Sequence, residues 1–288
     1  MSSSSTANTD GPTGVHENLW KDYKYPDMER ALKLTQQGAK GMINHVNAVL
    51  PFSKATSVLD IACGPGTVYR QLFDMDIPIA SSTKLLGIDI AQPMLDKIHE
   101  RQKTPQPGDD KTWDLVHAWL EDATRLSAAD GSQSHVLSQM GIFLIPNYSL
   151  ALHEAHRVLA ADGVFTMSAF RRSAWNDDIM ITLEQMHPER RLPRIADVWK
   201  DKDLFKIELE KHGFHDVVIH EIPLAMTYET PDQLIESLWT TIPYIKPAVE
   251  GLSEEQIRAC KDAMARKIET QFPNKVLPAV THLAVARK

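Results

Sequence analysis

A glycine-rich turn between an apolar run and an amphipathic stretch is the first place in this 288-residue chain where residue types and spacing suggest chemistry. The segment VLDIACGPGT, residues 58–67, predicts a buried strand, a tight turn and the start of a helix. Small residues let the backbone approach a ligand, and free N–H groups at a helix start can receive a carboxylate. The carboxylate of Asp60 suits a cationic amino group. We therefore expect an amino-acid-like ligand in contact with Asp60, Ala62, Cys63, Gly64 and Gly66.

The same turn must be weighed against the dinucleotide-binding fingerprint G-x-G-x-x-G. Gly64 and Gly66 supply the first two glycines, but position 69 is Tyr, where a nucleotide-binding sheet needs a small residue for close helix packing. A nicotinamide-dependent oxidoreductase is therefore disfavoured.

Acidic residues follow the next two apolar runs. Asp89 ends the run LLGID, and its carboxylate can accept both hydroxyls of a ribose while Ile90 covers the face of a base. The alternative is that Asp89 caps a helix that begins at Ala91. After the third run, Asp122, rather than Glu121, is expected to accept from an adenine amino group. The fourth run leads into a loop whose residues Gln139 and Met140 should lie closest to the ligand.

Alternating apolar runs and amphipathic stretches from about residue 55 to 168 predict βαβ units and a parallel sheet. The carboxyl ends of such strands share one edge, so the turn and the acidic residues would come together there. Helices are expected to begin near 91–93 and 146–149 and to stop at Asp162-Gly163. The expected strands are 57–61, 85–89, 113–119, 136–139, 164–168, 217–222 and 281–286.

Two segments, at about 171–201 and 223–273, are helical in pattern and rich in Trp, Met, Ile and Pro. We interpret them as lid insertions over the site; ordinary packing helices are the alternative. Of the histidines, His187 alone is a candidate general base, and no other catalytic residue is identified. No cluster has metal-ligand spacing, so no metal is expected. The candidates for enclosing an apolar substrate are Trp175, Trp199, Trp239 and Tyr244.

The composition of the whole chain narrows the classes of partner. A net charge of −7 without a dense basic run argues against nucleic acid. Two distant cysteines, Cys63 and Cys260, cannot form a disulfide framework, which fits a reducing cytoplasm. No stretch has the apolar length of a signal peptide core or a membrane span. We expect a disordered tail at 1–14 and a single cytoplasmic domain at 15–288 that acts on a small molecule away from membranes; the oligomeric state stays open.

The motifs VLDIACGPGT, LLGIDIAQPML, EDA and EAHRVLAADGVF resemble, in order and spacing, those of class I S-adenosylmethionine-dependent methyltransferases. VTHLAVARK is similar to the reversed last strand of that fold. The resemblance implies an α/β, Rossmann-like sheet of seven mostly parallel strands with the last strand antiparallel, flanked by helices, and S-adenosyl-L-methionine as cofactor. It adds Tyr23, Met94 and Ala123 to the cofactor-binding residues. One departure is His135, where many class I enzymes have Asp.

Three further stretches resemble the gliotoxin bis-thiomethyltransferase group of fungal secondary-metabolite enzymes: IELEKHGFHDVVIHEIP, PDQLIESLWTTIPYIKP and the DYKY at 22–25. This implies a small, largely apolar acceptor and transfer to a thiol. A thiol is nucleophilic at neutral pH, whereas an alcohol needs a base, and no clear His/Asp constellation is present on the loops. The alternatives are O- or N-methylation, a regulatory protein that binds the cofactor without turnover, and a cyclase.

Overall fold

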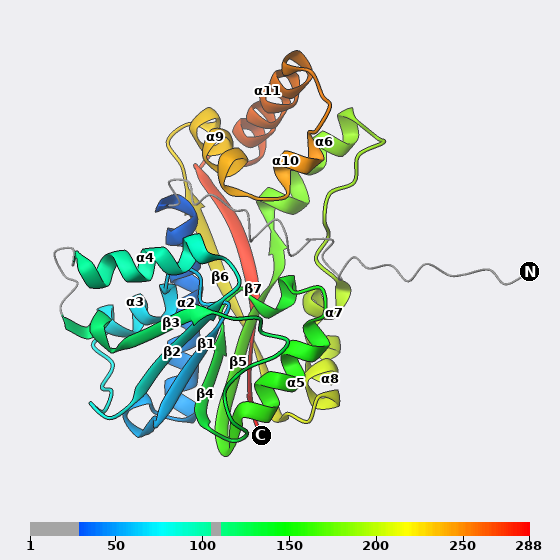
Figure 1. The fold of residues 1–288 in the computed structure, drawn as a ribbon. Helices are drawn as coiled ribbons and strands as arrows, with labels where there is room; N and C mark the ends of the chain where they lie inside the picture. The colour runs from blue at the N-terminus through cyan, green and yellow to red at the C-terminus, as the bar shows by residue number, and fades with distance from the viewer. Residues whose placement is uncertain (1–28, 105–110) are drawn as a thin grey trace, which may run out of the picture.

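The sheet has seven strands within the part of the chain that the computed structural model describes, residues 29–104 and 111–288 (Figure 1). Their order is β3-β2-β1-β4-β5-β7-β6, and β7 runs antiparallel to the other six strands. This confirms the expected fold class. The strands are β1 Ser57–Ile61, β2 Lys84–Asp89, β3 Val116–Leu120, β4 Gln133–Ser138, β5 Leu159–Ser173, β6 His215–Thr227 and β7 Val276–Arg287.

Helices cover both faces of the sheet, which is why its central strands are apolar on both sides. Every residue of β1 is buried. One face packs against α2 (Glu29–Val49), α3 (Thr67–Asp74) and α4 (Gln92–Lys103). The other packs against α5 (Tyr148–Val158), α7 (Asp197–Lys200) and α8 (Lys202–Lys211).

A third apolar cluster forms beyond the sheet, where β5 and β6 end and β7 begins. We call this part the helical cap; Figure 1 shows it as a separate group of helices above the carboxyl ends of the strands. It comprises a π-helical turn at Trp175–Ile179, α6 (Ile181–Met186), α9 (Pro231–Thr241), α10 (Ile245–Ala248) and α11 (Glu254–Gln271). No helix in the described ranges has the length and apolar character needed to cross a membrane.

Several boundaries differ from the sequence expectations. α5 ends at Val158, so Asp162-Gly163, the expected helix stop, lies inside β5. The third strand begins at Val116, because residues 111–115 form a 3₁₀ helix that turns Trp113 into the core. β5 and β6 run on to Ser173 and Thr227, so the starts of both expected lids are strand, held by pairing with β7. α7 packs with α8 and β5 instead of joining the helical cap. Tyr23, the DYKY stretch and the expected tail lie outside the described residues.

Candidate functional site

A cavity of about 270 Å³ opens where β1, β2, β3 and β4 end. This is the edge at which parallel α/β sheets bind ligands. Eleven of the residues that the sequence singled out line the cavity: Asp60, Ala62, Cys63, Gly64, Asp89, Ile90, Met94, Asp122, Ala123, Gln139 and Met140. The residues that sequence reasoning missed are Thr35, Pro65, Thr67, Val68, Ile88, Glu121, Thr124, Gly141, Leu144, Ile145, Pro146 and Asn147.

The turn after β1 has a backbone that few side chains tolerate. Gly64 and Gly66 have φ of 55° and 79°, and Ala62 has φ of 56°. A Cβ on Gly66 would lie 2.9 Å from the ring of Trp113, so only glycine fits between the turn and this ring. Gly66 does not line the cavity, contrary to the prediction that it contacts the ligand. Three residues beyond Gly66, Tyr69 is fully buried, and its hydroxyl donates to the Leu86 carbonyl at 2.6 Å. The tyrosine ring fills the space between α3 and the sheet, which agrees with the rejection of a dinucleotide site.

Asp60 is the most unusual group in the cavity. Its carboxylate is 1% exposed, and neither oxygen has a hydrogen-bond partner. Burial, and secondly the charge of Asp89, raise the pKa of Asp60 well above its ordinary value. A buried carboxylate without a partner is costly unless a cation pairs with it. The cavity therefore fits a ligand that brings a positive group to the end of β1.

Asp89 is held in place by the turn itself. Its two oxygens accept from the backbone N–H of Gly64 at 2.8 Å and of Ala91 at 2.9 Å. Burial raises the pKa of Asp89, while these N–H groups act in the opposite direction. Because Ala91 is itself the N-cap of α4 and has no side-chain cap, the helix-capping interpretation of Asp89 is wrong. Each oxygen keeps a lone pair for ligand hydroxyls.

The loop after β3 presents Asp122 instead of Glu121. Both oxygens of Glu121 are engaged, one by the Ser127 N–H at 2.7 Å and one by the Trp119 indole at 3.1 Å. Asp122 is exposed, and one of its oxygens accepts from the N–H and hydroxyl of Thr124, both at 2.8 Å. The choice of Asp122 as the acceptor toward a base is therefore the one the geometry favours.

The loop after β4 forms the floor of the cavity. Met140 has φ of 59°, and its N–H donates to the Ser168 hydroxyl at 3.0 Å. Gly141 permits the close approach of this loop to the β1 turn, because a Cβ there would lie 2.7 Å from the Cβ of Ala62. Gln139 donates to the carbonyl of Thr35 at 3.3 Å and so brings α2 into the site. Nothing in the local sequence of α2 signals this contact, which spans 104 positions.

The four aromatic substrate candidates do not line this cavity. Trp199 is fully buried, with ring centroids 4.8 Å from Tyr148 and 5.1 Å from Phe205, which is core packing. Trp175 is buried in the helical cap. Tyr244 donates to Asn176, and its pKa is raised by burial. Trp239 is half-buried, with the ammonium of Lys261 5.0 Å from its ring.

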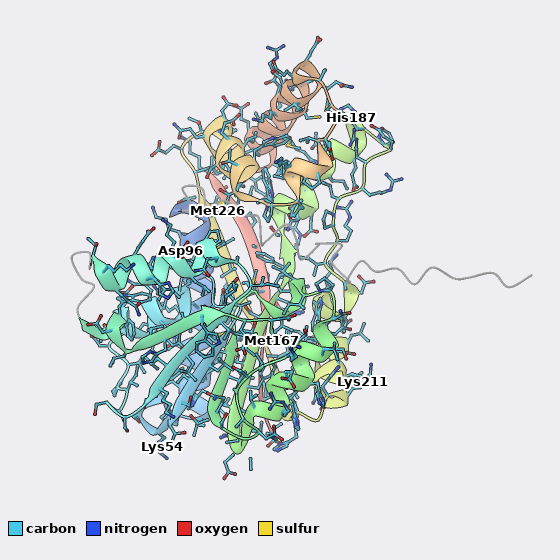
Figure 2. All side chains as sticks on the ribbon, viewed as in Figure 1. Lys54, Asp96, Met167, His187, Lys211 and Met226 are labelled. Carbon is cyan, nitrogen blue, oxygen red and sulfur yellow. The ribbon has the colours of Figure 1, made fainter. Side chains whose placement is uncertain are left out.

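His187 also lies away from the cavity. It follows α6 at the outer end of the helical cap (Figure 2), and its Nδ1 is 3.7 Å from Glu189. A general base must come within hydrogen-bond reach of the proton it removes, so this placement argues against His187. His135 lies toward the amino end of β4 and bonds the Leu50 carbonyl at 3.0 Å, so that departure from the class I pattern does not alter the cavity. No metal-ligand cluster occurs among the described residues.

Residues 59–167, which span the turn and all the acidic strand ends, match the family model described as a methyltransferase domain. Methyltransferase ucsB of Acremonium sp. is 24% identical over 229 residues, covering 78% of this chain and 79% of that protein. Methyltransferase tpcH of Aspergillus fumigatus is 22% identical over 213 residues, covering 71% and 72%.

Among solved structures, phosphoethanolamine N-methyltransferase 2 of Haemonchus contortus, in complex with S-adenosyl-L-methionine, has a similar fold. The TM-score is 0.55 at 16% identity, covering 94% of this chain and 59% of that chain. At this identity the likeness speaks for the fold, which agrees with the sheet order described above.

Proposed function

We propose that this chain, whose residues 59–167 match the model of a methyltransferase domain, transfers a methyl group from S-adenosyl-L-methionine to a thiol of a small, largely apolar secondary metabolite. The family match and the fold support S-adenosyl-L-methionine as the cofactor. Two methyltransferases from fungi among the relatives support a fungal metabolic role.

The observation that carries the proposal is the unpartnered carboxylate of Asp60 beside the anchored carboxylate of Asp89 in one cavity. Asp60 would hold the cofactor's ammonium group, directly or through water, and the N–H groups of the turn would receive its carboxylate. Asp89 would accept from the ribose hydroxyls. Asp122 would accept from the adenine amino group, with Ile90 and Met94 against the base.

S-adenosyl-L-methionine, when bound, supplies the methyl group and a sulfonium that leaves as a neutral thioether. The chain's own residues orient the reacting groups and exclude water. Met140 and Gly141 fix the floor near β4, and Leu144, Ile145 and Pro146 give the cavity an apolar side. These residues favour an apolar acceptor.

The ionisable side chains that line the cavity favour a thiol acceptor. Among the described residues these are Asp60, Cys63, Asp89, Glu121 and Asp122, with no histidine, lysine or tyrosine. Burial and the two nearby aspartates raise the pKa of Cys63, so its thiol is a poor base. An alcohol would need a base to remove its proton, whereas a thiol supplies enough thiolate at neutral pH.

The test is to incubate the purified protein with S-adenosyl-L-methionine and separate panels of dithiols, phenols and amines, and to measure S-adenosylhomocysteine. The proposal expects product with dithiols. Product with phenols or amines alone would establish O- or N-methylation instead. Cofactor binding without product in any panel would favour a regulatory protein.

A further inference from the structure

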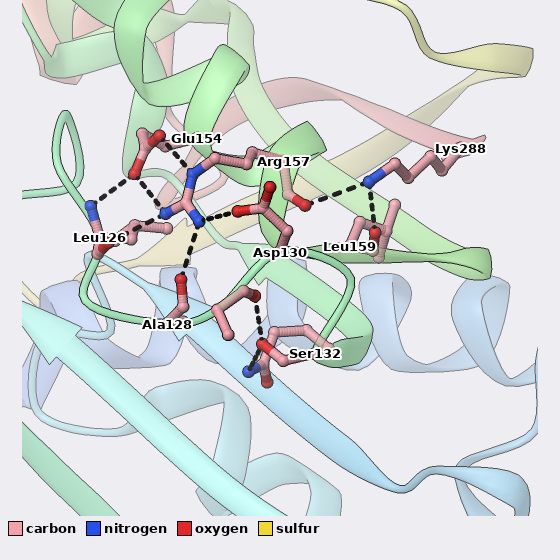
Figure 3. A network of polar contacts seen from close by, with 10 residues as sticks. Leu126, Ala128, Asp130, Ser132, Glu154, Arg157, Leu159 and Lys288 are labelled. Carbon is pink, nitrogen blue, oxygen red and sulfur yellow. Dashed lines mark hydrogen bonds and ion pairs between the residues drawn. The ribbon is translucent and has the colours of Figure 1, made fainter.

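Arg157, on α5, directs all of its N–H donors at one partner carboxylate and one loop (Figure 3). Nε and Nη2 donate to the two oxygens of Glu154, each at 2.7 Å. Nη2 also donates to the Leu126 carbonyl at 2.9 Å. Nη1 donates to the Ala128 carbonyl at 2.9 Å and to Asp130 at 2.6 Å. A guanidinium has five N–H donors in a rigid fork, and here each has an acceptor.

Glu154, on the same helix, holds the same loop; we call Arg157 and Glu154 together the clamp. Besides Arg157 it accepts from the backbone N–H of Leu126 at 2.7 Å, so both backbone groups of that residue are held by α5. The side chains of Glu154 and Arg157 are 13% and 24% exposed, which protects the pair from screening by solvent. Hydrogen bonding to Arg157 lowers the pKa of Glu154.

The clamped loop is the one that carries the cavity's acidic corner. It joins β3 to β4 without a helix or strand of its own, and it places Glu121, Asp122, Ala123 and Thr124 in the cavity. The clamp begins two residues beyond Thr124. Inside the loop, Arg125 N–H donates to the Asp122 carbonyl at 3.0 Å, which links the clamped part to the cavity part.

We propose that Arg157 and Glu154 are positioning residues that fix Asp122 and Ala123 for recognition of the adenine amino group. This inference rests on the proposed function, since it assumes that an adenosyl ligand occupies the cavity. Arg157 itself does not line the cavity. A lysine at this position would keep the charge but could not reach the separate acceptors of the guanidinium at once, so the loop would lose its fixed position.

The test uses Arg157→Lys with Arg194→Lys as a matched control. Arg194 also pairs with a glutamate, Glu184, that accepts a backbone N–H, from Leu192 at 2.6 Å. This pair joins α6 to the segment that follows it, and neither residue lines the cavity. Isothermal titration calorimetry would measure the dissociation constants of S-adenosylhomocysteine and of S-inosylhomocysteine, in which an oxygen replaces the 6-amino group.

We expect the wild type and Arg194→Lys to prefer the adenosyl ligand by the same ratio. We expect Arg157→Lys to weaken S-adenosylhomocysteine about tenfold, the equivalent of one or two lost hydrogen bonds, and to weaken the inosyl ligand less than twofold. Equal weakening of both ligands would show a merely structural role and overturn the inference. Unchanged dissociation constants for both ligands would also overturn it.

Circular dichroism would check that each variant is folded. Should Arg157→Lys not fold, Glu154→Gln keeps an oxygen for the Leu126 N–H or for Arg157 and is expected to reduce the ratio by a smaller factor; retention of the full ratio would then count against the clamp. Absence of S-adenosylhomocysteine binding by the wild type would instead refute the proposed function itself.

Discussion

Replacing Asp60 with asparagine is expected to raise the stability of the ligand-free protein and to weaken cofactor binding. The carboxylate is buried without a partner, and its raised pKa means that ionisation of Asp60 lowers the free energy of unfolding. The unfolded chain ionises this group above its ordinary pKa. The penalty is therefore present at neutral pH and disappears as pH falls below the ordinary value. Asparagine removes it, and each 1 kcal/mol gained would raise the melting temperature by roughly 2–4 °C in a chain of this size.

Binding should change in the opposite direction. Asparagine keeps an oxygen acceptor but loses the charge opposite the cofactor's ammonium group. A charge-assisted hydrogen bond contributes about 1.5–3 kcal/mol, so the dissociation constant for S-adenosyl-L-methionine should rise by about 10- to 150-fold. Thermal unfolding without ligand and calorimetric titration with ligand measure the two effects.

Asp89→Asn is the matched control, because both of its oxygens already accept backbone N–H groups. An amide there turns an N–H toward an N–H donor, so this variant should lose stability as well as affinity. A lower melting temperature for Asp60→Asn, together with an unchanged dissociation constant, would refute the assignment of Asp60 as an unpaired ligand group.

Truncating the ribose contact with Asp89→Ala should weaken cofactor binding by about 1–3 kcal/mol in a calorimetric titration, and unchanged affinity would remove that residue from the site. Gly66→Ala should cost about 1–3 kcal/mol of unfolding free energy in urea, because φ is 79° and the added Cβ would meet an indole ring at 2.9 Å; full stability would contradict the observed turn. Burial lowers the pKa of His135 and His220, so the folded chain binds fewer protons than the unfolded chain below pH of about 6.5. Relative to a His135→Asn, His220→Asn double variant, which keeps the opposing contribution of Asp60, the urea midpoint should therefore not change with pH above that value and should fall as pH decreases through it; the same pH dependence in both proteins would be inconsistent with buried neutral histidines. His187→Ala should leave kcat for methyl transfer within about twofold, whereas a loss of 10²-fold or more would restore it as a base.

The parts of the site that the sequence could predict are those where chain order fixes spatial order. Asp60, Asp89 and Asp122 each follow an apolar run, and parallel strands bring those ends to one edge. Thr35 could not be found this way, because α2 reaches the cavity through a contact with Gln139 far along the chain. The helical pattern also could not show whether an aromatic side chain faces the core or the ligand: Trp199, a candidate for enclosing the substrate, lies in the core.

The extended strand ends show a second limit of local pattern. Residues 223–227 alternate exposed and buried side chains in the period of a strand, and they pair with Pro278 and its neighbours on β7. The sequence contains this alternation, but the segment is interpreted as helical because the residues that follow it have a helical pattern rich in apolar side chains. Pairing between distant segments decided the structure there.

The most direct test of the methyltransferase assignment is to incubate the protein with S-adenosyl-L-methionine labelled in its methyl group and with dithiol, phenol and amine acceptors, and to analyse the products by mass spectrometry. We predict labelled methyl on the sulfur of a dithiol and an equal amount of S-adenosylhomocysteine, and a decrease of both in Asp60→Asn at a cofactor concentration below its dissociation constant. Bound cofactor with no labelled product in any acceptor class would contradict the assignment.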